Sequence, residues 1–193
     1  MLRIAPVLVV ALVAVSGAVA GGGPPRPSHR VVGTAGPDTL LGSARRDDLI
    51  GGSGNDELYG GRGADWLRGG SGADHLYGGD GADWVVGGTT DGLPSPIVHR
   101  ERLLGGAGND ILTSGAPGAV LIGGRGDDHL FVLDPRSSCR SEACVQWALG
   151  GRGDDQIWTD DGNPDVVDCG TGRDVLHADR SDRVSRCERV LTQ

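Results

Sequence analysis

The chain has 193 residues, of which 36 are glycine, and aromatic residues make up only 4% of it. This composition excludes a core of large aromatic side chains, and the glycines lack the every-third-residue spacing that collagen requires. The net charge of −8 argues against nucleic acid as a partner, because phosphates would be repelled, and suits metal ions or a polycation.

The N-terminal segment, residues 1–20, has one arginine, an apolar run and the small-x-small ending AVA. These features are typical of a cleaved signal peptide. A membrane anchor is the alternative, but Pro6 and the short apolar run over 7–15 disfavour it. We therefore expect a secreted, extracellular protein with no membrane span in the mature chain. Residues 21–32, rich in glycine and proline, predict a disordered linker.

A nine-residue unit then recurs along the chain. Four copies fill residues 51–86 without a gap, namely GGSGNDELY, GGRGADWLR, GGSGADHLY and GGDGADWVV. Such a fixed period is the mark of a repeat architecture. We expect one repeat domain over residues 33–193. Its parts are a first repeat block (33–88), a loop insert (89–104), a second block (105–131), a cysteine-containing insert (132–149) and a third block with a cap (150–193).

Each unit combines a turn with a short strand. Glycines at positions one, two and four allow positive φ and close backbone approach, so the first six residues predict a tight turn. The last three residues read x-apolar-x, a minimal strand with one side chain facing inward. Two units then make one lap of an all-β parallel solenoid, in which unit n stacks on unit n+2. The expected inward residues are Leu40, Leu49, Leu58, Leu67, Leu76, Val85, Leu112, Leu121, Leu130, Ile157 and Leu176.

Position six carries the chemistry, because an aspartate recurs there. Like turns in such a coil lie ~4.8 Å apart, so their carboxylates would repel one another unless a cation lay between them. Calcium suits this position because it is a hard ion that takes 6–8 oxygen ligands, whereas magnesium demands stricter octahedral geometry. The candidate ligands are Asp38, Asp47, Asp56, Asp65, Asp74, Asp83, Asp110, Asp128, Asp155 and Asp174.

These units resemble the repeats-in-toxin (RTX, haemolysin-type) calcium-binding nonapeptide, GGxGxDxUx. The resemblance implies a β-roll in which each ion bridges a turn and the turn one lap further on. It pairs 51–56 with 69–74 and 60–65 with 78–83, and gives poorer pairs at 33–38 with 51–56 and 42–47 with 60–65. Carbonyl ligands are expected from the turn glycines Gly51, Gly52, Gly54, Gly60, Gly61, Gly63, Gly69, Gly70, Gly72, Gly78, Gly79 and Gly81.

Four cysteines fit an oxidising compartment, although four cysteines allow three connectivities. The parsimonious pairing is Cys139 with Cys144 and Cys169 with Cys187. A zinc site is the rival interpretation, but the spacings do not provide two close CxxC pairs. The C-terminal stretch with Cys169 and Cys187 resembles a disulfide-closed cap of secreted actinobacterial relatives.

No pattern of residues indicates catalysis. Family enzymes carry a catalytic domain before the repeats, and the sequence has neither HExxH nor GxSxG. We therefore expect no enzyme but a calcium-binding protein whose folding is coupled to metal binding, because the aliphatic core is thin and the carboxylates oppose folding. Trp66 and Trp84, 18 residues apart, should share one outward face and Tyr59 and Tyr77 the other. The alternatives are mutual packing, a polysaccharide-binding adhesion surface of the cell envelope, or self-association.

Overall fold

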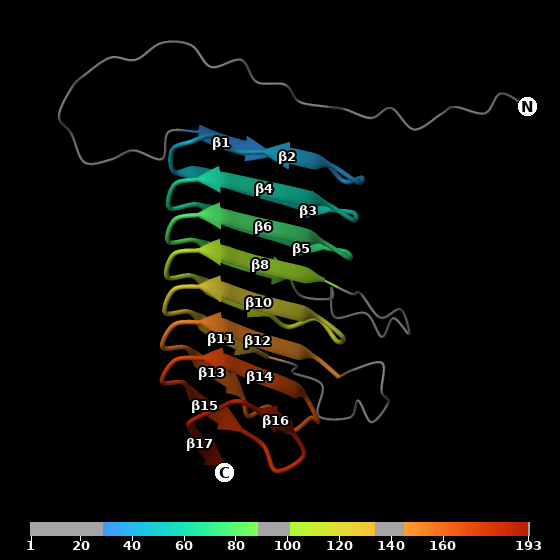
Figure 1. Ribbon diagram of the computed structural model, residues 1–193. Coiled ribbons are helices and arrows are strands. Elements are labelled where there is room, and N and C mark those ends of the chain that lie inside the picture. The colour runs from blue at the N-terminus through green and yellow to red at the C-terminus, as the bar shows by residue number, and fades with distance from the viewer. Residues whose placement is uncertain (1–28, 89–100, 134–144, 193) are drawn as a thin grey trace, which may run out of the picture.

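The computed structural model describes residues 29–88, 101–133 and 145–192. They form two parallel sheets that lie back to back and are joined by turns (Figure 1). The prediction of an all-β parallel solenoid is confirmed. Across these three ranges the structure contains no helix that is long and apolar enough to cross a membrane. The expected signal peptide lies outside the described residues.

Odd-numbered strands form one nine-stranded sheet and even-numbered strands one eight-stranded sheet. The nine-stranded sheet contains β1 (His29–Val32), β3 (Asp47–Ser53), β5 (Trp66–Ser71), β7 (Trp84–Gly88), β9 (Ile111–Ser114), β11 (His129–Val132), β13 (Gln156–Thr159), β15 (Val175–Ala178) and β17 (Arg189–Thr192). The eight-stranded sheet contains β2 (Thr39–Leu41), β4 (Glu57–Arg62), β6 (His75–Asp80), β8 (Arg102–Ala107), β10 (Val120–Arg125), β12 (Trp147–Arg152), β14 (Val166–Thr171) and β16 (Arg183–Ser185).

The register confirms that each unit stacks on the unit after next. Leu58 of β4 pairs with Leu76 of β6, 18 residues later, and neighbouring pairs keep the same offset. Where an insert intervenes, the offset lengthens but the alignment holds, since Leu76 pairs with Leu103. The inserts therefore lengthen the connections without shifting any inward side chain to the outer face of a sheet.

The strands are longer than the predicted x-apolar-x segments. β4 runs for six residues from Glu57 to Arg62 and so includes the first two glycines of the next unit. Gly61 pairs with Gly79 of β6 in the same ladder as Leu58 and Leu76. Because the glycines continue the backbone pairing, the turn proper is shorter than the six residues expected.

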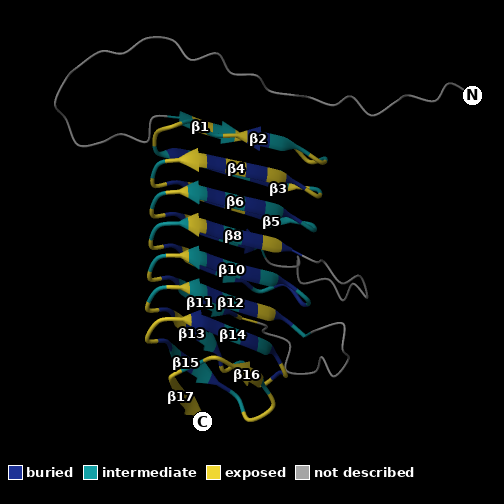
Figure 2. Ribbon diagram, in the orientation of Figure 1, coloured by how far each residue is buried: buried dark blue, intermediate teal, exposed yellow. Residues whose placement is uncertain are grey.

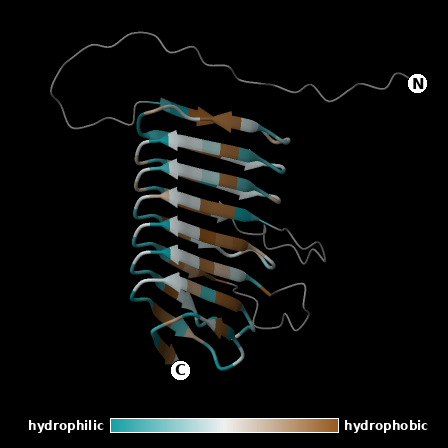
Figure 3. Ribbon diagram, in the orientation of Figure 1, coloured by the Kyte–Doolittle hydropathy of each residue, from teal (hydrophilic) through white to brown (hydrophobic). Residues whose placement is uncertain are grey.

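The core is a single file of aliphatic side chains between the sheets. Buried residues recur along the strands of successive laps (Figure 2). All eleven predicted inward residues are buried, with Leu40 the most exposed at 3%. Leu103, Ala148 and Val167, which were not among the predicted inward residues, extend the file. Hydrophilic residues follow the turn edge drawn at the left (Figure 3). A core one side chain thick is consistent with the low aromatic content.

Three predicted boundaries need correction. Residues 29–32, assigned to the linker, form β1, whose backbone pairs with β3 from His29 opposite Asp47. The predicted insert 89–104 ends earlier, because Arg102 begins β8. The insert 132–149 likewise gives way to β12 at Trp147. In each case backbone pairing with the neighbouring lap extends order into residues that lack the nonapeptide pattern.

The C-terminus is closed by the predicted Cys169–Cys187 disulfide, whose Cα atoms lie 5.1 Å apart. Cys169 lies in β14, and Cys187 lies in the turn between β16 and β17. Arg186 in the same turn makes an ion pair with Asp168. Cys139 and Cys144 lie outside the described residues, so their pairing stays a prediction.

Candidate metal centre

The turns form two edges of the solenoid. Edge I contains the turns from the nine-stranded to the eight-stranded sheet, and edge II contains the turns back, at the left of Figure 1. The residues in position six of edge I are Asp38, Asp56, Asp74, Glu101, Ala119, Gln146, Asp165 and Asp182. Those of edge II are Asp47, Asp65, Asp83, Asp110, Asp128, Asp155, Asp174 and Glu188.

The ten predicted aspartates are thus divided unequally, three on edge I and seven on edge II. Both inserts leave from edge I, because they connect β7 to β8 and β11 to β12. Edge II is therefore an unbroken series of acidic residues. Glu101, Asp165, Asp182 and Glu188 were not among the predicted ligands. In the sequence each is an acidic residue two places before an aliphatic one, a weak signal where the glycines are absent.

A ladder of hydrogen bonds connects the carboxylates along each edge. On edge II, the backbone N–H of Asp65 donates to Oδ1 of Asp83 at 2.8 Å, and the same bond recurs from Asp47 to Glu188 at 2.8–2.9 Å. On edge I, Asp38 and Asp56 donate in the same way to the next lap at 2.9 Å. The predicted turn pairs, 51–56 with 69–74 and 60–65 with 78–83, are neighbours in these ladders.

The second carboxylate oxygen is buried in these turns. Oδ2 accepts no hydrogen bond in Asp56, Asp65, Asp83, Asp110, Asp128, Asp155 and Asp174. A buried anionic oxygen without a partner is costly, so each one indicates a missing proton or cation. The same oxygen recurs at every lap of edge II from Asp65 to Asp174.

Burial also changes the acidity of these groups. It raises the pKa of Asp65, Asp83 and Asp110 to about 6 from 3.8, against the opposing effect of the backbone N–H that each accepts. The pKa of Asp155 rises to about 7 and that of Asp128 to about 8, where burial is again the first cause and neighbouring carboxylates add to it. Carboxylates that resist ionisation in the empty fold are ones that a cation would stabilise.

The first glycine of the unit makes room beside each carboxylate. A Cβ added at Gly60 would lie 2.6 Å from Oδ2 of Asp65 and 2.5 Å from the carbonyl oxygen of Gly78, one lap on. At Gly78 the corresponding atoms are Oδ2 of Asp83 and the carbonyl oxygen of Gly105, at 2.5 and 2.6 Å. We call this space, defined by a glycine, its own carboxylate and the next lap's carbonyl, a cradle.

Nine such cradles occur among the described residues. Those on edge I begin at Gly33, Gly51 and Gly69, and those on edge II begin at Gly42, Gly60, Gly78, Gly105, Gly123 and Gly150. Calcium accepts carboxylate and carbonyl oxygens together, so the donor set fits this ion. Over the same part of the chain, no group of three or more His, Cys, Asp or Glu side chains could hold a metal, so backbone carbonyls are indispensable to any such site.

The first turn of each edge is different, as the missing glycines suggested. Thr34 donates to Oδ2 of Asp38 from both its backbone N–H and its hydroxyl, at 2.5 and 2.9 Å. Ser43 does the same to Asp47 at 2.5 and 2.9 Å. A hydroxyl at position two therefore supplies the hydrogen bonds that the corresponding oxygens of later laps lack.

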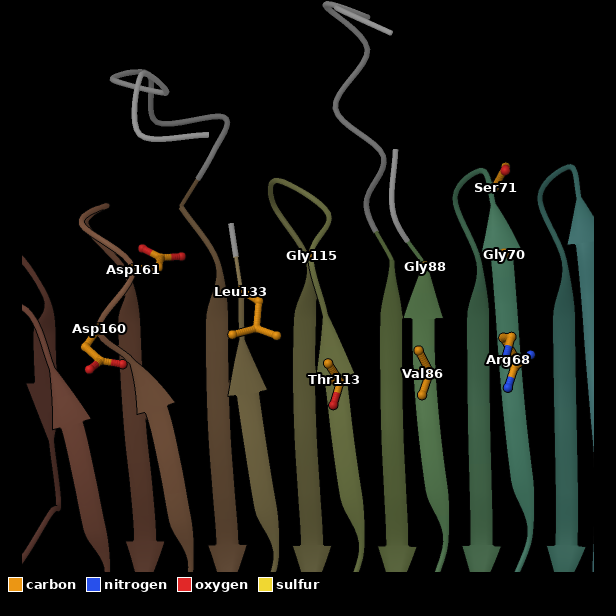
Figure 4. A pocket seen from close by; sticks show the side chains of 10 residues that line it. All are labelled: Arg68, Gly70, Ser71, Val86, Gly88, Thr113, Gly115, Leu133, Asp160 and Asp161. Atoms are coloured by element: carbon orange, nitrogen blue, oxygen red, sulfur yellow. The ribbon is translucent and has the colours of Figure 1, made fainter. Parts of the chain in front are cut away.

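The outer sheet faces carry the predicted aromatic pairs. Trp66 and Trp84 lie on the nine-stranded sheet with ring centroids 5.1 Å apart, and Tyr59 and Tyr77 stack on the other sheet at 4.7 Å. A hollow of about 780 Å³ also lies on the nine-stranded sheet. Its side chains extend across neighbouring strands, with two aspartates at one end (Figure 4). None of the residues that line it is a position-six carboxylate, so this hollow is separate from the cradles.

The chain matches the family model of the RTX calcium-binding nonapeptide repeat. The matched residues are 32–67, 59–92, 100–116, 120–132 and 147–176, more than half of the chain. Neither the curated proteins nor the solved structures include a significant match. The predicted resemblance is thus confirmed, and the chain belongs to the RTX calcium-binding nonapeptide repeat family.

Proposed function

We propose that this protein is an exported calcium-binding β-roll in which ions lie between successive turns and drive folding. The observation that carries the proposal is the cradle, which repeats at one-lap intervals with a buried carboxylate oxygen, such as Oδ2 of Asp65, that accepts no hydrogen bond. The role is one of binding and structure, without catalysis.

Each ion would draw its ligands from two laps. In the cradle at Gly60, Oδ2 of Asp65 and the carbonyl oxygen of Gly78 face the same space. Calcium takes 6–8 oxygens at 2.3–2.6 Å, so further turn carbonyls or waters would complete the shell. The bound ion would supply positive charge between carboxylates that otherwise repel one another.

Folding should depend on that charge. The core is a single file of aliphatic residues, and the glycine-rich backbone loses more conformational entropy on folding than other sequences do. Buried like charges oppose the compact state as well. Metal binding that occurs only in the folded state supplies the missing stabilisation.

Export is proposed from the sequence of residues 1–20 and from the disulfide between Cys169 and Cys187, which suits an oxidising compartment. N-terminal sequencing of the protein recovered from the medium should begin at Gly21. Protein that stays in the cell with Met1 intact would contradict export.

The decisive experiment for calcium-coupled folding is a calcium titration of the purified protein, followed by far-ultraviolet circular dichroism from a chelated start. We expect a cooperative transition from coil to β-structure with calcium, and none with magnesium at the same concentrations. Full β-structure in the chelated protein would refute the coupling of folding to calcium.

A second function, binding of surface polysaccharide, is supported by one observation. Trp66 and Trp84 are 42% and 44% exposed beside Asp48 and Arg68, around a small hollow of about 170 Å³. Exposed aromatic rings next to polar groups suit sugar rings. Replacing both tryptophans with alanine should abolish retention on polysaccharide while the calcium transition remains. Unchanged retention would leave mutual packing as their role.

A further inference from the structure

The geometry points to a one-sided calcium ladder: ions occupy edge II along its length, whereas edge I binds them only in its first laps and is metal-free after the cradle at Gly69. This inference rests on the proposed function, because it concerns where the ions lie. Neither the family match nor the repeat pattern distinguishes the two edges, since alternate units contribute to each.

On edge II, no side chain stands at position one for six successive laps. Position one is glycine from Gly42 to Gly150, and each of these glycines faces its own Asp Oδ2 and the carbonyl oxygen of the next lap. The run of nine-residue units is interrupted twice in the sequence, yet the ladder bond from Asp83 to Asp110 and that from Asp128 to Asp155 remain at 2.8 and 2.9 Å. The inserts therefore do not interrupt this edge.

On edge I, buried side chains occupy the same space from the fifth lap onward. In the register of the strands, position one falls at Ser114, Val132, Thr159 and Ala178, and each is at most 1% exposed. A Cβ at this place lies where the cradle carboxylate and carbonyl oxygens of other laps converge. A calcium ion with 6–8 ligands does not fit in a space that a side chain already fills.

Between Asp74 and Asp165, the carboxylates of edge I are lost or hydrogen-bonded, whereas Asp165 itself remains a buried carboxylate. Ala119 and Gln146 replace aspartate, and both are fully buried. Glu101, at the boundary, accepts a hydrogen bond from the Ser114 hydroxyl at 2.7 Å. At Gly87 no next-lap carbonyl is among the three nearest atoms, and Cδ1 of Leu103 lies there at 3.2 Å from the added Cβ. Neutral side chains at Ala119 and Gln146 and a hydrogen bond at Glu101 thus take the place of the ion, and at Asp165 the filled position one excludes it.

Edge II also ends where a side chain replaces the glycine at position one. Cys169 stands at position one of its last full turn, and its side chain forms the disulfide with Cys187. The N–H of Asp174 then donates to Oε2 of Glu188 at 2.9 Å. The last ion of edge II therefore belongs to the cradle at Gly150, and the covalent bond closes the lap beyond it.

A matched pair of variants tests this assignment in the purified protein. Asp155→Asn removes a carboxylate from edge II beside Gly150, and Asp165→Asn removes one from the later part of edge I. Both aspartates are buried, and both accept a backbone N–H through Oδ1, from Asp128 at 2.9 Å and from Gln146 at 3.0 Å. Asparagine keeps that acceptor in both variants, and only Asp155 stands in a cradle.

Native mass spectrometry in calcium then counts the ions. We expect Asp155→Asn to lose at least one ion and Asp165→Asn to keep the wild-type number. Loss of an ion from Asp165→Asn would overturn the one-sided ladder while leaving calcium binding intact. A wild-type protein that binds no calcium would instead refute the proposed function.

Terbium luminescence gives a second measurement that leaves every buried carboxylate unchanged. Energy transfer from an excited indole to bound terbium falls steeply with distance. Trp84 directly follows Asp83 on edge II, and Trp147 directly follows Gln146 on the later part of edge I. Trp84→Phe should remove much of the sensitised emission and Trp147→Phe little of it. An equal loss in both variants would contradict a metal-free edge.

Discussion

The backbone N–H of Asp83 donates to Oδ1 of Asp110 at 2.8 Å, although 27 residues separate them. Asp65 makes the same bond to Asp83 at the same distance across 18 residues. The longer separation arises because the insert between β7 and β8 lies on edge I, the opposite side of the solenoid. The hydrogen-bond ladder of edge II thus stays continuous because the insert lies on the other edge, and it does not require an uninterrupted nonapeptide pattern.

Asp110 should therefore be as important to calcium binding as the aspartates of the regular repeats. Asp110→Asn keeps the acceptor for Asp83 but removes a charge beside Gly105. We expect the calcium concentration at the folding midpoint to rise on the order of 10–100-fold, the scale at which metal sites respond to lost ligand support. Circular dichroism during a calcium titration measures it.

Asp80→Asn is the control for that substitution. The Asp80 side chain is 69% exposed and makes an ion pair with Arg62 at 3.6 Å, an interaction that contributes little at a surface. Its midpoint should match that of the wild type. A shift as large as that of Asp110→Asn would mean that net charge, and not the ladder, determines the response.

Gly60 should not tolerate a methyl group. Gly60→Ala would place Cβ 2.6 Å from Oδ2 of Asp65 and 2.5 Å from the carbonyl oxygen of Gly78. We expect a loss of folding free energy of about 1–3 kcal/mol, typical of overpacking, together with weaker calcium binding. Chemical denaturation in saturating calcium measures the first effect and the calcium midpoint the second.

Gly36→Ala is the matched control, because only the Thr34 hydroxyl oxygen comes within 4.0 Å of an added Cβ there. Neither Gly36 nor Gly60 has positive φ, so backbone strain does not distinguish them. Equal stability of the two variants would show that the cradle at Gly60 can widen at no cost.

The sequence was sufficient to predict the lap, the pairing of unit n with unit n+2 and the inward aliphatic file. These depend on a strict period of nine, and Leu58 opposite Leu76 follows from it directly. The position-six aspartates were predicted for the same reason. Because the strands of successive laps pair in register, the position of each residue within a regular unit decides whether it faces the core, the outer face or the turn.

The sequence was not sufficient where the glycines of the unit are absent. Glu101, Asp165 and Glu188 stand in position six, yet none of them follows the GGxG pattern. Their place is determined by pairing of the following strand with its neighbour, as Arg102 with His75 shows. An insert lies on edge I when it connects a strand of the nine-stranded sheet to a strand of the eight-stranded sheet. This can be decided only after those strands have been located.

The Cys169–Cys187 disulfide should stabilise the last laps. It closes a loop with a sequence separation of 18, and a loop of that size contributes about 3 kcal/mol by restricting the unfolded chain. Replacing both cysteines with serine should lower the unfolding temperature in saturating calcium, as measured by differential scanning calorimetry. Hydrogen exchange should rise in β15 to β17 and remain low near β4. Uniformly faster exchange along the chain would show that the solenoid unfolds as one unit from this end.

The last prediction concerns pH in the absence of calcium. In the fold, the pKa of Asp65 and Asp83 is raised to about 6 and that of Asp128 to about 8, from 3.8. The folded chain thus binds more protons than the unfolded chain between about pH 4 and pH 8, so its stability is greatest at the acidic end and falls as pH rises through these values.

Metal-free protein should gain β-structure on acidification from pH 8 to pH 4. With calcium the dependence reverses, because protons compete for the same oxygens. Asp128→Asn, which has no proton to lose, should reduce the change between pH 7 and pH 8. Circular dichroism across this range in metal-free buffer provides the check, and β-structure that increases with pH would contradict a fold in which proton and calcium neutralise the same carboxylates.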